Sequence, residues 1–139
     1  MFCGTGSDVG KSVIATAVCR IFKQDGMHPA PFKAQNMAPF YNLTADGKRV
    51  ARAQGVQAEA AGIKLSTDMN PLLLIPTGEK SSEVIVEGES IGIKTAMQLY
   101  AEEDRNYLRS CIQKAYNRLA KQYDPIVIEG AGSISEMNL

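Results

Sequence analysis

The residues best suited to chemistry lie in a glycine-rich stretch near the start of the chain: Gly4-Thr5-Gly6-Ser7-Asp8-Val9-Gly10-Lys11-Ser12. Glycines allow backbone torsions closed to other residues, so successive N–H groups can point at one anion. A following helix adds the partial positive charge of its N-terminus. Lys11 can then bridge the outer phosphates of a nucleotide, and the Ser12 hydroxyl can bind Mg²⁺. The stretch predicts a phosphate-binding loop, one residue longer than the common pattern; the alternative is a glycine-rich turn followed by an ordinary surface lysine.

Glu129 is the second candidate, because it follows the apolar run 125–128, which is typical of a buried strand. A carboxylate there is costly unless it meets a cation. Mg²⁺ bound to nucleotide phosphates is such a cation, and Gly130 and Gly132 let the backbone approach the same ligand. We favour this metal role over a surface glutamate in a turn, because the phosphate loop is expected at the same edge of the sheet.

Two further charged residues have two interpretations each. Asp46 is either a third metal ligand or an acid at a helix N-terminus, where it stabilises the helix by about 0.3–1 kcal/mol. Lys33 follows a predicted strand, and it either stabilises charge that develops during phosphoryl transfer or is a solvated lysine. Spacing alone does not separate these interpretations.

The elements that must position these residues alternate between helix and strand. Apolar spacing predicts helices over 11–25, 46–61 and 95–123. It predicts strands over 29–34, 72–75 and 125–128, a hairpin from 83–87 and 90–94, and a loop over 35–44. Strands separated by helices predict an α/β fold with a mostly parallel sheet covered on both faces. Ligands of such sheets bind at the carboxyl ends of the strands, where both glycine-rich stretches are expected.

Composition excludes several classes of function. The 139 residues suit one domain, and 15 basic against 15 acidic residues give no electrostatic footprint for nucleic acid or for an anionic membrane. No apolar run approaches the roughly 20 residues that span a bilayer. Cys3, Cys19 and Cys111 form no C-x-x-C pair, and His28 is the single histidine, so a disulfide framework or a zinc site is not expected. These counts predict a cytoplasmic protein.

The chain resembles the N-terminal part of the cobyric acid synthases, the glutamine-dependent amide ligases of cobalamin biosynthesis. Besides the phosphate loop, the matching blocks are Pro31-Phe32-Lys33-Ala34-Gln35-Asn36-Met37, Thr44-Ala45-Asp46-Gly47, Arg52-Ala53-Gln54, Gln57-Ala58-Glu59-Ala60-Ala61-Gly62, Asp68-Met69-Asn70-Pro71 and Glu129-Gly130-Ala131-Gly132-Ser133. The blocks at 32–37 and 68–71 are specific to this family. The longer phosphate loop and the block at 129–132 are shared with dethiobiotin synthetases and cobyrinic acid a,c-diamide synthases. The resemblance implies a three-layer, dethiobiotin-synthetase-like P-loop NTPase fold.

The resemblance also implies an activity. MgATP would activate peripheral carboxylates of adenosylcobyrinic acid a,c-diamide, and ammonia from glutamine would form the amides of adenosylcobyric acid. The loop from Gly4 to Ser12 would hold the triphosphate, with Lys11 and Lys33 as the catalytic cations. By the same resemblance, the Mg²⁺ ligands would be Ser12, Asp46 and Glu129, and the residues near the corrinoid carboxylate would be Gln35, Asn36 and Asn70.

The chain also departs from the family pattern. Ile75 stands where the family has a lysine, Ala38-Pro39-Phe40-Tyr41 replaces a Ser-Asn-rich stretch, and Ile134 replaces a proline. Family members continue past both ends of this sequence. Residues 1–139 are therefore expected to be a partial P-loop amide-ligase domain, with a sheet incomplete at both ends. The family's glutaminase domain, or another source of ammonia, would lie outside the chain.

Three other functions stay open. A P-loop ATPase switch of the partition-protein kind would carry another lysine early in the loop, which residues 5–7 lack. A catalytically inert copy is a second alternative. A dethiobiotin synthetase is the nearest other enzyme, although the blocks at 32–37 and 68–71 argue against it. The sequence is compatible with a homodimer.

Overall fold

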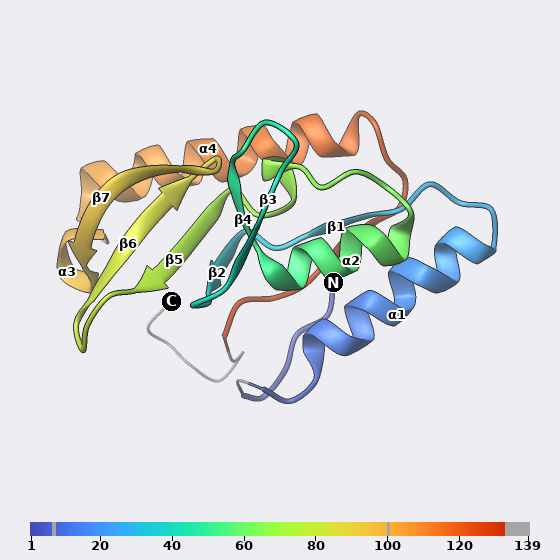
Figure 1. The fold of residues 1–139 in the computed structure, drawn as a ribbon, viewed down its shortest axis with the longest axis horizontal. Coiled ribbons are helices and arrows are strands. Elements are labelled where there is room, and N and C mark those ends of the chain that lie inside the picture. Colours follow the sequence, from blue (N-terminus) through green and yellow to red (C-terminus); the bar gives the residue numbers. More distant parts are fainter. Residues whose placement is uncertain (7, 100, 133–139) are drawn as a thin grey trace.

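The computed structural model describes residues 1–6, 8–99 and 101–132. The helices are α1 (Lys11–Gln24), α2 (Arg52–Ala61), α3 (Ala96–Leu99) and α4 (Glu102–Ala120), with a 3₁₀ helix η1 (Thr67–Met69). The strands are β1 (Ala30–Phe32), β2 (Gln35–Met37), β3 (Tyr41–Leu43), β4 (Arg49–Ala51), β5 (Leu72–Pro76), β6 (Ser81–Val86), β7 (Glu89–Thr95) and β8 (Ile126–Ile128). Figure 1 shows helices and strands interleaved along the chain, so the predicted α/β class is confirmed.

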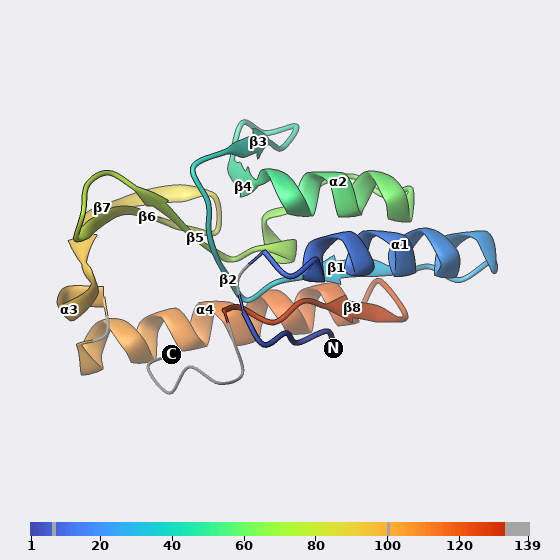
Figure 2. The same cartoon turned by 90° about the horizontal axis from the view of Figure 1, so that it is seen from below.

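Helices cover both sides of the central strand β1, as Figure 2 shows: α1 and α2 lie on one side and α4 on the other. On the first side, Ala15 and Cys19 of α1 share a buried cluster with Val127 of β8. On the second side, Leu119 of α4 shares a cluster with Phe32 of β1. This arrangement gives the three layers that the sequence predicted.

The strands beside the candidate site pair in parallel. In the β1–β8 pair Phe32 lies opposite Ile128, and in the β2–β5 pair Asn36 lies opposite Leu73. The β5–β6, β6–β7 and β3–β4 pairs are antiparallel. Short turns, such as the two residues Glu87 and Gly88 between β6 and β7, can join only antiparallel strands. Parallel pairing therefore lies next to the predicted ligand edge, and an antiparallel extension lies beyond it.

Three predicted elements need correction. The helix expected over 46–61 begins at Arg52, because residues 44–48 form the turn between β3 and β4, in which Gly47 takes a φ of 81° that glycine tolerates. The loop expected over 35–44 contains β2 and β3, since β2 finds a buried partner in β5. The helix expected over 95–123 divides into α3 and α4.

The longest helix, α4, buries a single stripe. Leu108, Cys111, Ala115 and Leu119 are buried along it at spacings of three and four residues, and acidic residues fill its first turn. The first half of the stripe covers the β5–β6 sheet, where Leu108 joins Leu72 and Val84 in one cluster. Within the described ranges, neither α4 nor any other helix combines the length and the apolar character that crossing a membrane requires.

Candidate functional site

The glycine-rich loop leads directly into α1. Gly10 precedes Lys11, the first residue of the helix, with a φ of 92°, a left-handed conformation that glycine adopts without strain. No side chain of the described residues caps this end of the helix, so its first N–H groups are free to bind an anion. The Lys11 Nζ lies 2.6 Å from the carbonyl oxygen of Gly6, which folds the lysine back over the loop. The local structure is that of the predicted phosphate loop.

The parallel pair β1–β8 brings a lysine and a glutamate together at its carboxyl end. Because Phe32 lies opposite Ile128, the next residues, Lys33 and Glu129, emerge side by side. The Lys33 Nζ donates to Oε1 of Glu129 over 2.6 Å. Both residues are buried, with Glu129 only 2% exposed. A buried ion pair of this kind is stable only when its remaining polar atoms are also satisfied.

Two further donors satisfy the Glu129 carboxylate. The Ser12 hydroxyl, at the start of α1, donates to the same Oε1 over 2.7 Å. The Gln57 side chain, on α2, donates to Oε2 over 2.8 Å. Burial alone would raise the pKa of the Glu129 carboxyl, but the hydrogen bonds from Lys33, Ser12 and Gln57 outweigh it and hold the pKa below its usual range. Glu129 is therefore a carboxylate at neutral pH.

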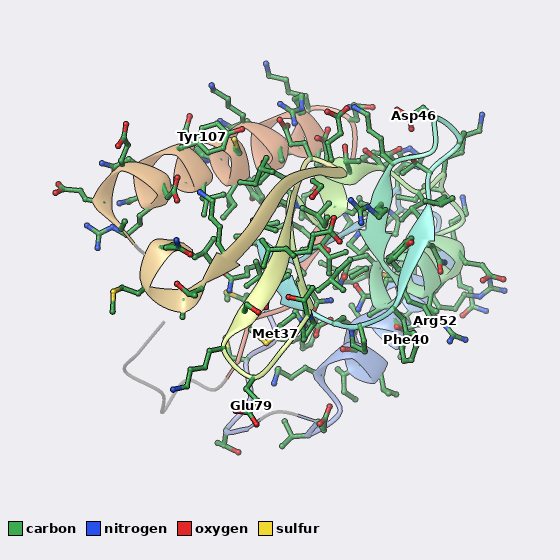
Figure 3. The ribbon with its side chains drawn as sticks, turned by 60° about the vertical axis from the view of Figure 1, so that its left-hand side comes forward. Met37, Phe40, Asp46, Arg52, Glu79 and Tyr107 are labelled. Atoms are coloured by element: carbon green, nitrogen blue, oxygen red, sulfur yellow. The ribbon has the colours of Figure 1, made fainter. Side chains whose placement is uncertain are left out.

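A cavity of about 700 Å³ opens over this cluster. Its walls come from the phosphate loop, the ends of β1 and β8, strand β2 and the start of α2. The lining residues are Asp8, Gly10, Lys11, Ser12, Val13, Lys33, Gln35, Asn36, Met37, Ala38, Ala53, Glu129, Ala131 and Gly132. Figure 3 shows Met37 at the end of the sheet that is near the loop before α1. The cavity thus joins cationic groups, free backbone N–H groups and a carboxylate, which suits a polyphosphate with its metal ion.

The oxygen atoms present fit Mg²⁺ held jointly with phosphates. The Ser12 hydroxyl and the Glu129 carboxylate are hard oxygen ligands 2.7 Å apart. Among the residues that the structure describes, no group of three or more His, Cys, Asp or Glu side chains could hold a metal ion. An all-protein metal cage is therefore not a fit, whereas one carboxylate and one hydroxyl completed by phosphate oxygens and water is the usual Mg²⁺ arrangement.

Most of the predicted site residues meet at this cavity. Lys11, Ser12, Lys33 and Glu129 face it, and so do the predicted substrate residues Gln35 and Asn36. The rest of the loop from Gly4 to Gly10 leads into it, except that Ser7 lies outside the described residues, as do Ser133 and Ile134.

Asp46 does not join the other two predicted metal ligands. It lies in the β3–β4 turn, which Figure 3 shows at the far end of the molecule from the phosphate loop. Its Oδ1 accepts a hydrogen bond from the Thr44 hydroxyl over 2.5 Å, and this contact holds the pKa of Asp46 below its usual range. The alternative role at a helix N-terminus is wrong, because α2 begins only at Arg52. In this structure Asp46 closes a turn.

Asn70 does not line the cavity; its buried side chain supports the backbone of the strands that end there. It is 1% exposed, and its amide group donates to the carbonyl oxygens of Lys33, over 3.1 Å, and Leu72, over 3.0 Å. Its Oδ1 accepts from the backbone N–H of Ala51 over 3.3 Å. These bonds tie three strand ends together, so Asn70 fixes the backbone that carries Lys33.

Gln54 and Gln57 are the site residues that the sequence reasoning missed. Both are 0% exposed, and they lie three residues apart on the same face of α2. Two signals were present: both glutamines stand in blocks that match the family, at 52–54 and 57–62, and they lie at helical spacing in an alanine-rich helix. Their partners come from β2 and from the end of β8, which no local pattern identifies.

Comparisons with known proteins agree with this geometry. Residues 1–137 match the model of the family described as CobQ/CobB/MinD/ParA nucleotide binding domain. Over its whole length the chain is 58% identical to a cobyric acid synthase from Phocaeicola vulgatus and 57% identical to one from Bacteroides fragilis, and it spans 28% of each of those proteins. A cobyric acid synthase from Salmonella gallinarum is 51% identical over 140 residues, with 27% of its length covered. The resemblance predicted from the sequence motifs is confirmed.

Proposed function

The chain belongs to the CobQ/CobB/MinD/ParA nucleotide-binding domain family, and from this premise we propose that it binds MgATP and activates a corrinoid carboxylate for amidation. The observation that carries the proposal is the convergence of Ser12 and Lys33 on Glu129, beside Lys11, in one cavity. The similarity to cobyric acid synthases supports the choice of substrate. The chain spans only 28% of those relatives, so the activity is assigned to the whole protein to which these residues contribute.

Each residue has a separate role in the proposed reaction. Free N–H groups at the start of α1 bind phosphate oxygens, and Lys11 exchanges the carbonyl oxygen of Gly6 for a phosphate oxygen. Ser12 and Glu129 would hold Mg²⁺, and the ion would supply positive charge that neutralises the phosphates. Lys33 stabilises the charge that develops on the transferred phosphoryl group. Asn36 and Gln35, which line the same cavity, orient the substrate carboxylate.

The proposed chemistry has two steps. A carboxylate oxygen of the corrinoid attacks the terminal phosphorus of ATP, forming an acyl phosphate and releasing ADP. Ammonia then attacks the acyl carbon, the C–O bond to phosphate breaks, and the proton lost by the nitrogen passes to the departing phosphate, so that the products are the amide and inorganic phosphate. The role of the cavity is to position the two reactants and to stabilise charge, which are the main contributions an enzyme makes to phosphoryl transfer.

Ammonia would come from a glutaminase outside the 139 residues. A glutaminase triad needs a histidine, and the only one in the sequence, His28, packs against Tyr123 with ring centroids 4.8 Å apart. The contact lies in the turn before β1, at the opposite end of that strand from Lys33. We therefore assign the release of ammonia to another domain or chain.

The test is amidation with ammonium ions supplied directly. The protein that contains this chain is incubated with ATP, Mg²⁺, ammonium chloride and adenosylcobyrinic acid a,c-diamide, and the corrinoid products are separated by chromatography and identified by mass. We expect amidated corrinoid and ADP from the wild type, and neither from Lys11→Ala. Lys23→Ala, at the exposed far end of the same helix, is the matched control and should retain activity. ATP-dependent carboxylation of a biotin precursor, or no corrinoid product under these conditions, would overturn the proposal.

A further inference from the structure

Three buried side-chain amides form a chain that ends on Glu129. Nδ2 of Asn36 donates to Oε1 of Gln54 over 3.0 Å. Nε2 of Gln54 donates to Oε1 of Gln57 over 3.4 Å, and Nε2 of Gln57 donates to Oε2 of Glu129 over 2.8 Å. Asn36 is thus the first donor, Gln54 and Gln57 each accept one hydrogen bond and donate the next, and the Glu129 carboxylate is the final acceptor.

The burial of these groups makes their order rigid. Gln54 and Gln57 are 0% exposed and Asn36 is 8% exposed. No buried side-chain nitrogen or oxygen among the described residues lacks a hydrogen-bond partner. If the amide of Gln57 were reversed, its oxygen would face the Glu129 carboxylate and its nitrogen would face the nitrogen of Gln54. Two buried contacts between like groups are costly, so the hydrogen-bond direction of the whole chain is fixed.

We propose that Gln57 is a positioning residue for the metal-binding carboxylate of Glu129, and that Gln54 and Asn36 act through it. This inference rests on the proposed function. Gln57 holds Oε2 on the side of α2, which directs Oε1 toward Ser12 and the cavity. Lys33 and Ser12 hold Oε1 on the cavity side. A carboxylate whose orientation is already fixed in this way binds the metal without first losing rotational freedom.

The amide chain also connects two walls of one cavity. Asn36 and Glu129 both line it, and they are joined behind the wall by three hydrogen bonds through Gln54 and Gln57. A substrate carboxylate that binds Asn36 therefore contacts one end of the chain, while Mg²⁺ contacts the other end. Any coupling between the two sites is reciprocal, so each ligand strengthens or weakens the binding of the other by the same factor.

The test compares ATP binding with and without Mg²⁺ in Gln57→Met. Methionine has nearly the length and flexibility of glutamine and lacks the N–H donor. Titration calorimetry of ATP in Mg²⁺ and in EDTA gives the ratio of the two affinities, a measurement independent of catalysis. Loss of a partner that orients a metal ligand lowers metal affinity by about 10-fold or more. We expect the ratio to fall by about that factor in Gln57→Met, while the affinity in EDTA changes by less than about twofold.

Two controls separate positioning from a general loss of stability. Ala58→Gly destabilises the same helix at a buried position that takes no part in the amide chain, so it should leave the Mg²⁺ ratio unchanged. Gln54→Met should lower the ratio in the same direction as Gln57→Met, and the double variant should match Gln57→Met alone, since the residues act in series. Gln54→Met also serves as the test if Gln57→Met does not fold.

The measurements distinguish failure of this inference from failure of the proposed function. An unchanged Mg²⁺ ratio in Gln57→Met, or additive effects in the double variant, overturns this inference and leaves the proposed function standing. A wild type whose ATP affinity does not depend on Mg²⁺ overturns both.

Discussion

Replacing Lys33 with methionine should cost the folded protein about 3 kcal/mol of stability at neutral pH. The change removes the cation 2.6 Å from Glu129, whose side chain is 1% exposed. Removal of one partner from a buried ion pair costs about 3–5 kcal/mol, because the other charge is left uncompensated. Here Ser12 and Gln57 still donate to the carboxylate, so the cost should lie at the lower end of that range.

The loss of stability caused by Lys33→Met should decrease as the pH falls. In the wild type the pKa of Glu129 is held below its usual range, so its charged form stabilises the fold above the unfolded pKa, and this stabilisation is lost as the pH falls through the folded pKa. Without Lys33 the effect of burial prevails, and the pKa of Glu129 should rise. On acidification Glu129 becomes neutral in both proteins. The difference in unfolding free energy between the wild type and Lys33→Met should then fall toward the contribution of one hydrogen bond, about 1 kcal/mol.

Urea denaturation followed by far-ultraviolet circular dichroism measures this difference, since the chain has no tryptophan for fluorescence. The matched control is Lys48→Met, which removes an exposed ion pair in which Lys48 and Glu89 lie 3.5 Å apart and are 37% and 74% exposed. That pair should contribute less than about 1 kcal/mol at any pH. Two results would refute the assignment of Lys33 and Glu129 as a charged, buried pair. One is a loss of stability in Lys33→Met no greater than in Lys48→Met, and the other is a loss that is equal at neutral and acidic pH.

Three further predictions concern the loop, the β3–β4 turn and a buried thiol. Gly4→Ala should weaken ATP binding about 10-fold, as measured by calorimetry. The added Cβ would lie 2.7 Å from Cγ2 of Val9, and overpacking of about 1–3 kcal/mol would distort the loop. Unchanged binding would show that the loop adapts. Asp46→Ala should leave the Mg²⁺ dependence of ATP binding unchanged, because the structure places Asp46 in a turn away from the cavity; a loss of that dependence would restore Asp46 as a metal ligand. Cys19 should resist alkylation by iodoacetamide at pH 8, since burial raises the pKa of its thiol to about 11. The exposed Cys3 should react. Equal labelling of the two cysteines, measured by mass spectrometry, would contradict the burial of Cys19.

The core of the site could be predicted from the sequence, because its signals are local. The phosphate loop and the helix that follows it are adjacent in the chain, and Glu129 directly follows a short apolar strand. The parallel β1–β8 register then places Lys33 beside it. The sequence left Lys33 with two interpretations, because only the register of two strands 96 residues apart decides between them.

The remaining site residues depend on contacts that no local pattern contains. Gln57 meets Glu129 across 72 residues of sequence, so its role is visible only in the folded chain. Asp46 was assigned by resemblance, yet Gly47 and the Thr44 hydroxyl form a turn there. Residues 35–37 contain the turn former Asn36 but still make a strand, because pairing with β5 outweighs the local preference.

The most direct test of the account is the binding of ATP to the cavity at Lys11. Titration calorimetry should show one ATP bound per chain, with higher affinity in Mg²⁺ than in EDTA. Lys11→Ala removes a charged contact to ATP and should weaken ATP binding by about 10-fold or more. Lys23→Ala should bind ATP with the same affinity as the wild type. Equal ATP affinity in the wild type and Lys11→Ala would contradict the account.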